Sequence, residues 1–82
     1  MPRFYFDVRE GPQFTPDHEG LEFNSFDAAE YEAARTAAEI GREALPTGKA
    51  SEVTVEMRDE HGQPVLTVAV AMTVRRRNRA YT

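Results

Sequence analysis

The sequence contains no cysteine among its 82 residues, which excludes disulfide bonds and thiolate chemistry. It also lacks any apolar run near the roughly 20 residues that cross a membrane as a helix. Its first residues lack the apolar stretch and cleavage site of a secretory signal peptide, and no glycine-rich phosphate-binding loop occurs. We therefore expect a cytoplasmic protein that has no membrane association and needs no cofactor.

Charge is unevenly distributed along the chain. Residues 1–74 hold six basic and fourteen acidic side chains, whereas the last eight residues add four arginines and no acid. We interpret residues 1–74 as a single α+β domain and residues 75–82 as a basic, flexible C-terminal tail. An acidic body repels nucleic acid, and a basic tail attracts it.

One long helix is predicted over residues 25–45. Ser25 is a suitable N-cap because its hydroxyl can accept a hydrogen bond from the first turn. Pro46 ends the helix because its ring disfavours helical geometry at the residue before it. Spacings of three and four place one set of mostly small residues on a single buried face: Phe26, Ala29, Ala33, Ala37, Ile40 and Ala44.

The remainder of the chain shows the period-two alternation of half-buried strands. We predict strands over residues 3–9, around 14–15, over 53–58 and from 65 to about 74, with a brief extended piece at 21–23. The resulting ββαββ order predicts an antiparallel sheet of about four strands with one long helix packed on one face. The strand order within the sheet stays open.

The last predicted strand has two different faces. Its inner face carries Leu66, Val68, Val70, Met72 and Val74, and its other face carries only small, weakly polar side chains. An exposed strand of this kind invites pairing with another chain, so we predict a homodimer, by sheet extension or by stacking of the small-residue face. A monomer with a slightly exposed sheet is the alternative. The predicted interface comprises Thr67, Ala69, Ala71 and Thr73, with Tyr5 if its strand is adjacent.

No group of residues predicts catalysis or metal binding. His18 and His61 each stand among acidic residues on a turn, but neighbours on one turn rarely converge on one ion. No histidine is placed by a known motif to activate Ser25 or Ser51. We therefore predict no catalytic residue and no metal site, and a non-enzymatic domain that binds protein, itself first.

The arginine-rich tail supports an alternative from another class. It offers charge, and a ring at Tyr81, for contacts to a nucleic-acid backbone. The alternative function is an antitoxin-like or nucleic-acid-associated regulator, although Tyr5 alone could serve as a stacking platform on the sheet. The residues concerned are Arg75, Arg76, Arg77 and Arg79.

Four stretches also resemble a known family: Met-Pro-Arg-Phe-Tyr-Phe-Asp-Val at the start, Asp-His-Glu-Gly-Leu-Glu-Phe before the helix, Ala-Ala-Arg-Thr-Ala-Ala-Glu-Ile within it and Met-Arg-Asp-Glu-His-Gly-Gln-Pro-Val-Leu after it. They resemble a family of small proteins, common in rhizobia and related alphaproteobacteria, that is described as a domain of unknown function. The resemblance implies no activity and no functional residues, and the arginine-rich end departs from it. A shorter stretch, residues 21–29, resembles the HicB-type antitoxin domain, which underlies the antitoxin-like alternative.

Overall fold

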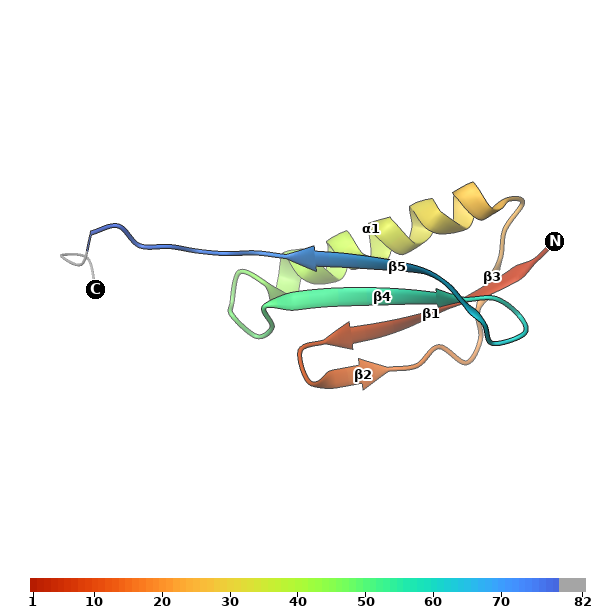
Figure 1. The fold of residues 1–82 in the computed structure, drawn as a ribbon, viewed down its shortest axis with the longest axis horizontal. Helices are drawn as coiled ribbons and strands as arrows, with labels where there is room; N and C mark the ends of the chain where they lie inside the picture. The colour runs from red at the N-terminus through yellow and green to blue at the C-terminus, as the bar shows by residue number, and fades with distance from the viewer. Residues whose placement is uncertain (79–82) are drawn as a thin grey trace.

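The computed structural model describes residues 1–78, which form five strands and one helix (Figure 1). All five strands belong to one antiparallel sheet, in which β1 and β4 are central and β5 is one edge. The other edge is made by β2 and β3, which both pair with β1. The elements are β1 (Arg3–Glu10), β2 (Gln13–Thr15), β3 (Leu21–Glu22), α1 (Phe26–Ala44), β4 (Glu52–Arg58) and β5 (Pro64–Ala71).

This arrangement confirms the predicted α+β class. In the sequence α1 stands between the two hairpins, and in the structure it packs against the sheet. The sheet has five strands rather than about four, because the extended piece before the helix adds the two-residue strand β3. The structure also supplies the strand order β2-β1-β4-β5, which no periodicity in the sequence could give.

Helix α1 begins and ends where the capping residues predict. The Ser25 side chain accepts a hydrogen bond from the Ala28 N–H over 3.1 Å, and Leu45 is the C-cap. Phe26, predicted on the buried face, is instead 42% exposed, because it is the first residue of α1 and lies at the rim of the core, where its ring packs edge-on against Phe4. The buried residues of the helix are all small: Ala29, Ala33, Ala37, Gly41 and Ala44.

The core lies between these small residues and the bulkier side chains of the strands. Ala33 and Ala37 pack with the fully buried Val55 of β4. Because alanine brings the helix backbone close to the sheet, the strands supply most of the apolar volume, and each fully buried side chain stabilises the fold by about 2 kcal/mol. Around this centre pack three residues of the predicted inner face of the last strand and two residues of β1: Leu66, Val68, Val70, Phe6 and Val8.

Strand β5 is shorter than predicted. It ends at Ala71, which pairs with Glu52, the first residue of β4. Beyond that point the chain has no neighbouring strand, so Met72 is 41% exposed and Val74 is 75% exposed. The alternation of the sequence thus continues for three residues past the end of the sheet, and these residues have no strand partner within residues 1–78.

Candidate functional site

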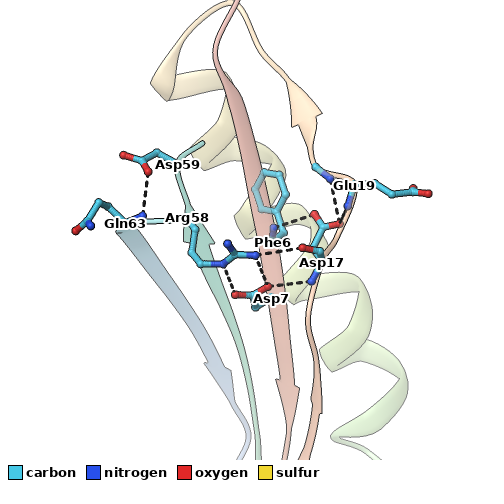
Figure 2. Close-up of polar contacts among 8 residues, drawn as sticks. Phe6, Asp7, Asp17, Glu19, Arg58, Asp59 and Gln63 are labelled. Atoms are coloured by element: carbon cyan, nitrogen blue, oxygen red, sulfur yellow. Dashed lines mark hydrogen bonds and ion pairs between the residues drawn. The ribbon is translucent and has the colours of Figure 1, made fainter. Parts of the chain in front are cut away.

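The edge made by β2 and β3 is interrupted, and an aspartate fills the interruption (Figure 2). The Asp17 carboxylate accepts a hydrogen bond from the Phe6 N–H of β1 over 3.0 Å. Its other oxygen accepts the N–H groups of Glu19 and Gly20 over 3.0 and 3.1 Å. A side chain therefore takes the acceptor role that a neighbouring strand would have at Phe6. We call the β2 and β3 side of the sheet the closed edge.

An ion pair on the helix-free face of the sheet holds this segment in place (Figure 2). Asp7 of β1 is only 5% exposed, and its carboxylate accepts bonds from Nε and Nη2 of Arg58 over 2.6 and 3.1 Å. The Asp17 N–H donates to Asp7 over 2.9 Å, and Arg58 Nη2 donates to the Asp17 carbonyl over 3.1 Å. We call Asp7, Asp17 and Arg58 the polar clasp.

The electrostatics of the polar clasp favour its charged form. The Arg58 guanidinium lowers the pKa of Asp7 below its ordinary value, against the opposing effect of burial. Burial raises the pKa of Asp17, but the N–H groups of Phe6, Gly20 and Glu19 together outweigh it, and its pKa is also lowered. Both carboxylates therefore remain ionised at neutral pH.

The polar clasp is saturated by structural contacts. The Arg58 guanidinium carbon also lies 5.2 Å from the centroid of the Tyr5 ring, a cation–π distance. Within residues 1–78, no buried side-chain nitrogen or oxygen lacks a hydrogen-bond partner. The carboxylates thus serve as acceptors for backbone and guanidinium donors, and their geometry fastens residues 16–20 to the sheet.

The hollows of the surface are shallow. One of about 510 Å³ opens between the second half of α1 and the end of β1. Three glutamates and Lys49 are its charged lining, with no serine or histidine that could act as nucleophile or base: Glu10, Glu39, Ile40, Glu43, Ala44, Thr47 and Lys49. Among residues 1–78, no three histidine, aspartate or glutamate side chains are grouped to hold a metal ion, and this includes those near His18 and His61.

Strand β5 forms the opposite edge, which we call the open edge. The Phe6 N–H points away from β4, toward Asp17, so Phe6 and the facing Met57 do not bond to each other. Met57 therefore directs its own N–H and C=O toward β5, where it pairs with Leu66. Leu66 and every second residue after it therefore bond to β4. The backbone groups of the residues between them point away from the sheet and have no strand beside them in residues 1–78: Thr67, Ala69 and Ala71.

Three of the five predicted interface residues are therefore brought together at the open edge. Thr67, Ala69 and Ala71 are exposed, and their side chains share the helix-free face. Thr73 lies beyond the end of β5, in the exposed continuation of the strand. Tyr5 shares the same face, but β4 separates its strand from β5 and Arg58 covers its ring. The structure thus does not place Tyr5 beside the others.

The tail arginines leave the sheet at the end where β5 stops (Figure 1). Arg75, Arg76 and Arg77 are exposed, and the ion pairs within residues 1–78 involve Arg3, Arg35 and Arg58 instead. Arg79, the fourth arginine of the predicted nucleic-acid contact, lies outside the described residues.

Sequence reasoning missed the polar clasp. The one local signal is that Asp7 and Arg58 both stand at outward positions of predicted strands, where an ionic residue is ordinary. What joins them is the pairing of β1 with β4, across 51 residues of sequence. Asp17 resembles an ordinary turn residue, and its role depends on Phe6 having no strand beside it.

The comparisons with known proteins identify a family but no activity. No curated protein and no solved structure matches the chain. Within residues 1–78, no helix is long and apolar enough to span a membrane. A model described as a domain of unknown function, DUF6894, matches residues 3–71 and thus spans all five strands and the helix. The chain therefore belongs to the DUF6894 family, in agreement with the resemblance to a domain of unknown function seen in the sequence.

Proposed function

We propose that the chain is a non-enzymatic protein-binding domain, and that it binds a second copy of itself by antiparallel pairing at the open edge. One observation carries the proposal: β5 is an eight-residue edge strand without a charged side chain. Charges, an interior proline, a bulge or a cover are the usual protections of an edge. Pro64 stands only at the first position of β5, and the single irregularity lies at that same end.

A two-fold axis at Ala69 pairs all three outward-facing positions. Ala69 then faces its own copy, and Thr67 faces Ala71, which gives about six backbone hydrogen bonds across the interface. In this register, side chains on the helix face of one copy continue onto the helix face of the other. The two helices therefore lie on the same side of one continuous sheet. The dimer thus extends the sheet without exposing a new apolar surface.

The same register accounts for the alternation that continues past β5. Met72 and Val74, which have no strand beside them in the described part of their own chain, come to lie beside Leu66 and Pro64 of the second copy. Their apolar side chains then fall on the helix side of the sheet, where the alternation of the sequence placed them. A partner strand therefore supplies the neighbour that β4 is too short to provide.

The interface is modest in size, so its affinity is modest. About six hydrogen bonds contribute roughly 1 kcal/mol each after desolvation, burial of the exposed Met72 and Val74 in both copies contributes roughly 1.5 kcal/mol per side chain, and association itself costs at least about 4 kcal/mol. We expect a dissociation constant on the order of micromolar.

Ala69→Pro tests the proposal. Proline removes one outward N–H at the centre of the proposed interface but leaves the bonds to β4, which is why edge strands tolerate it. We expect sedimentation at micromolar concentration to show a dimer for the natural sequence and a monomer for Ala69→Pro. Ala69→Val keeps the N–H and the strand preference, and should remain dimeric.

A further variant separates edge pairing from stacking of the small-residue faces. Thr54 lies on the helix-free face of β4, in the row of Ala69 but away from the edge. Thr54→Lys should abolish a stacked dimer and leave an edge-paired dimer intact. A natural chain that stays monomeric up to about 100 micromolar, well above the dissociation constant expected for this interface, would contradict self-association. A dimer that survives Ala69→Pro and is lost in Thr54→Lys would replace edge pairing with stacking.

The nucleic-acid alternative has one supporting observation, the exposure of Arg75, Arg76 and Arg77 beyond the sheet. Under this alternative, a chain ending at Val74 dimerises normally but no longer shifts labelled RNA or DNA in a low-salt gel, because phosphate contacts depend on these charges. We expect no such shift with either chain.

A further inference from the structure

Helix α1 and strand β5 run in the same direction, which gives the molecule two distinct ends. Near the start of both elements, Ala29 packs in the cluster that Leu66 joins. Near their finish, a Cβ on Gly41 would lie 3.4 Å from Val70. The start of the helix and the β4–β5 loop therefore lie at one end, and the C-terminal segment leaves at the other (Figure 1).

The first end carries exposed carboxylates on the side of the open edge. Asp59 and Glu60 lie in the β4–β5 loop. Asp59 accepts the His61 and Gln63 N–H groups over 2.8 and 2.9 Å, which hold its pKa below the ordinary value. Together with two carboxylates in the first turns of α1, these residues form what we call the acidic end: Asp27, Glu30, Asp59 and Glu60.

The flank of the helix at this end faces the same way as the open edge. Glu30 and Ala34 precede Gly41 by eleven and seven residues, so the three share one line along the helix, and Gly41 faces Val70 of β5. Asp27, Glu30, Tyr31 and Ala34 border a shallow hollow of about 300 Å³ on this flank. The Tyr31 ring is 70% exposed beside it.

Antiparallel pairing brings opposite ends of two copies together. With the two-fold axis at Ala69, Val74 of one copy lies beside Pro64 of the other, where β5 begins and the strand register ends. The segment 75–77 continues past this point toward the β4–β5 loop of the second copy, which carries Asp59 and Glu60. If the alternation of β5 is continued past Val74 in the dimer, Arg76 falls on the helix side of the sheet, toward the flank that carries Asp27 and Glu30.

We propose that, in this dimer, the arginines at 75–77 of each copy bind the acidic end of the other copy. The inference rests on the proposed function, and it assigns the tail a role in self-recognition. Charge complementarity carries it: three adjacent cations meet four carboxylates, of which Asp27, Glu30 and Glu60 are exposed, and each contact occurs twice by symmetry. Met72 and Val74 lead into the contact and bring apolar surface toward Tyr31. Pairs of this kind steer association and fix the register more than they add affinity.

The experiment uses charge reversal on the full chain. The tail variant is Arg75→Glu, Arg76→Glu and Arg77→Glu, and the acid variant is Glu30→Lys with Glu60→Lys. Each should weaken the homodimer by roughly tenfold at low salt, because exposed pairs contribute up to about 1 kcal/mol apiece. Glu43→Lys with Glu56→Lys makes the same change in net charge as the acid variant, but away from the acidic end. This control should leave the dissociation constant within about twofold.

Mixing the two variants gives the decisive result. In a heterodimer, the acidic tail of one copy meets the basic end of the other, and the natural tail meets the natural acidic end. We expect the mixture to dimerise as tightly as the natural chain, although each variant alone is weakened. Fluorescence anisotropy with one labelled variant measures this.

The outcomes separate the inference from the proposed function. A dimer lost in Ala69→Pro but unchanged in the tail and acid variants keeps edge pairing and overturns the tail contact. Weakening in both variants without recovery on mixing also overturns it. A shift of labelled RNA or DNA that the tail variant abolishes, with no change in dimerisation, assigns the arginines to nucleic acid instead. A monomeric natural chain removes both proposals.

Discussion

The two edges of the sheet are treated in opposite ways. At the closed edge the neighbouring strand is broken into β2 and β3, and the break is filled by the Asp17 carboxylate, which is held by Asp7 and Arg58. At the open edge β5 runs for eight residues without a charge. The four residues between β2 and the buried Gly20 thus close one side of the sheet. Within residues 1–78, no corresponding segment covers the other side.

The contrast teaches where association can occur. A sheet with two bare edges pairs at either side and grows into open chains of molecules, whereas a sheet with one bare edge closes as a two-fold dimer. Protection at one edge therefore does more than prevent aggregation, because it limits pairing to a single partner. Substitutions that break the closed edge, each compared with a matched substitution elsewhere in the chain, test this contrast.

Arg58→Leu should have the largest effect. It leaves the Asp7 carboxylate buried without its cation, and breaking a buried pair in this way costs about 3 kcal/mol of folding free energy. Urea unfolding followed by circular dichroism measures the loss. Because the clasp also holds Asp17, we expect the variant to form species larger than a dimer, which size-exclusion chromatography would detect.

Arg35→Leu is the matched control. Arg35 makes ion pairs of 2.8 and 2.7 Å with Glu32 and Glu39 on the surface of α1. Exposed pairs of this kind contribute under about 1 kcal/mol. Equal losses for Arg35→Leu and Arg58→Leu would show that the clasp adds no more than a surface pair, and the contrast between the edges would lose its energetic basis.

Gly20→Ala should have the next largest effect. Gly20 has φ +69°, and a Cβ there would lie 2.8 Å from the Phe4 carbonyl oxygen and 2.9 Å from the Tyr5 ring. The backbone of β1 cannot move aside as a flexible side chain does. We therefore expect the free energy of unfolding to fall by about 2 to 3 kcal/mol, which includes both the cost of a left-handed alanine and the displacement of β3. Thermal unfolding of the purified variant measures it.

Gly62→Ala isolates the part of this loss that comes from close approach. Gly62 has φ +80° in the β4–β5 loop, and nothing lies within 4 Å of a Cβ built there. Its substitution should cost only the left-handed backbone conformation, about 1 kcal/mol. If both glycine variants unfold at the same temperature, the segment before β3 does not press on β1 as the structure indicates.

The elements of the fold could be predicted because their signals are local. Ser25 and Pro46 mark the ends of α1, and the alternation of apolar residues marks the strands. The end of β5 could not be predicted this way, because it depends on where β4 begins rather than on any residue of β5. Gly41, buried against Val70, was likewise missed, since glycine carries no periodic apolar signal.

The candidate site could likewise be predicted where its signal is local, but not where it depends on how distant strands pair. Thr67, Ala69 and Ala71 could be found from one strand, since a small, uncharged face on the last strand is visible in the sequence. Whether that strand is at an edge depends on strand order, which no local pattern encodes. Tyr5 was placed with them on the condition of adjacency, and β4 lies between.

The smallest expected effect is the response of the closed edge to acid. The pKa values of Asp7 and Asp17 are lowered in the folded chain, so below about pH 4 the unfolded chain binds protons that the folded chain does not. Their contribution is therefore complete above the unfolded pKa and is lost as the pH falls through the folded values. The free energy of unfolding should fall as the pH is lowered from about 4 to about 2.

Asp7→Asn assigns this dependence to the clasp. The variant is less stable at neutral pH, but its free energy of unfolding should change less between pH 4 and pH 2, because one of the two coupled carboxylates is gone. Glu32→Gln removes a carboxylate whose pKa is lowered by Arg35 on the helix surface, where solvent weakens the pair. It should flatten the pH profile less than Asp7→Asn does. The reverse order would place the acid response on the helix, and the closed edge would then be held by packing rather than by charge.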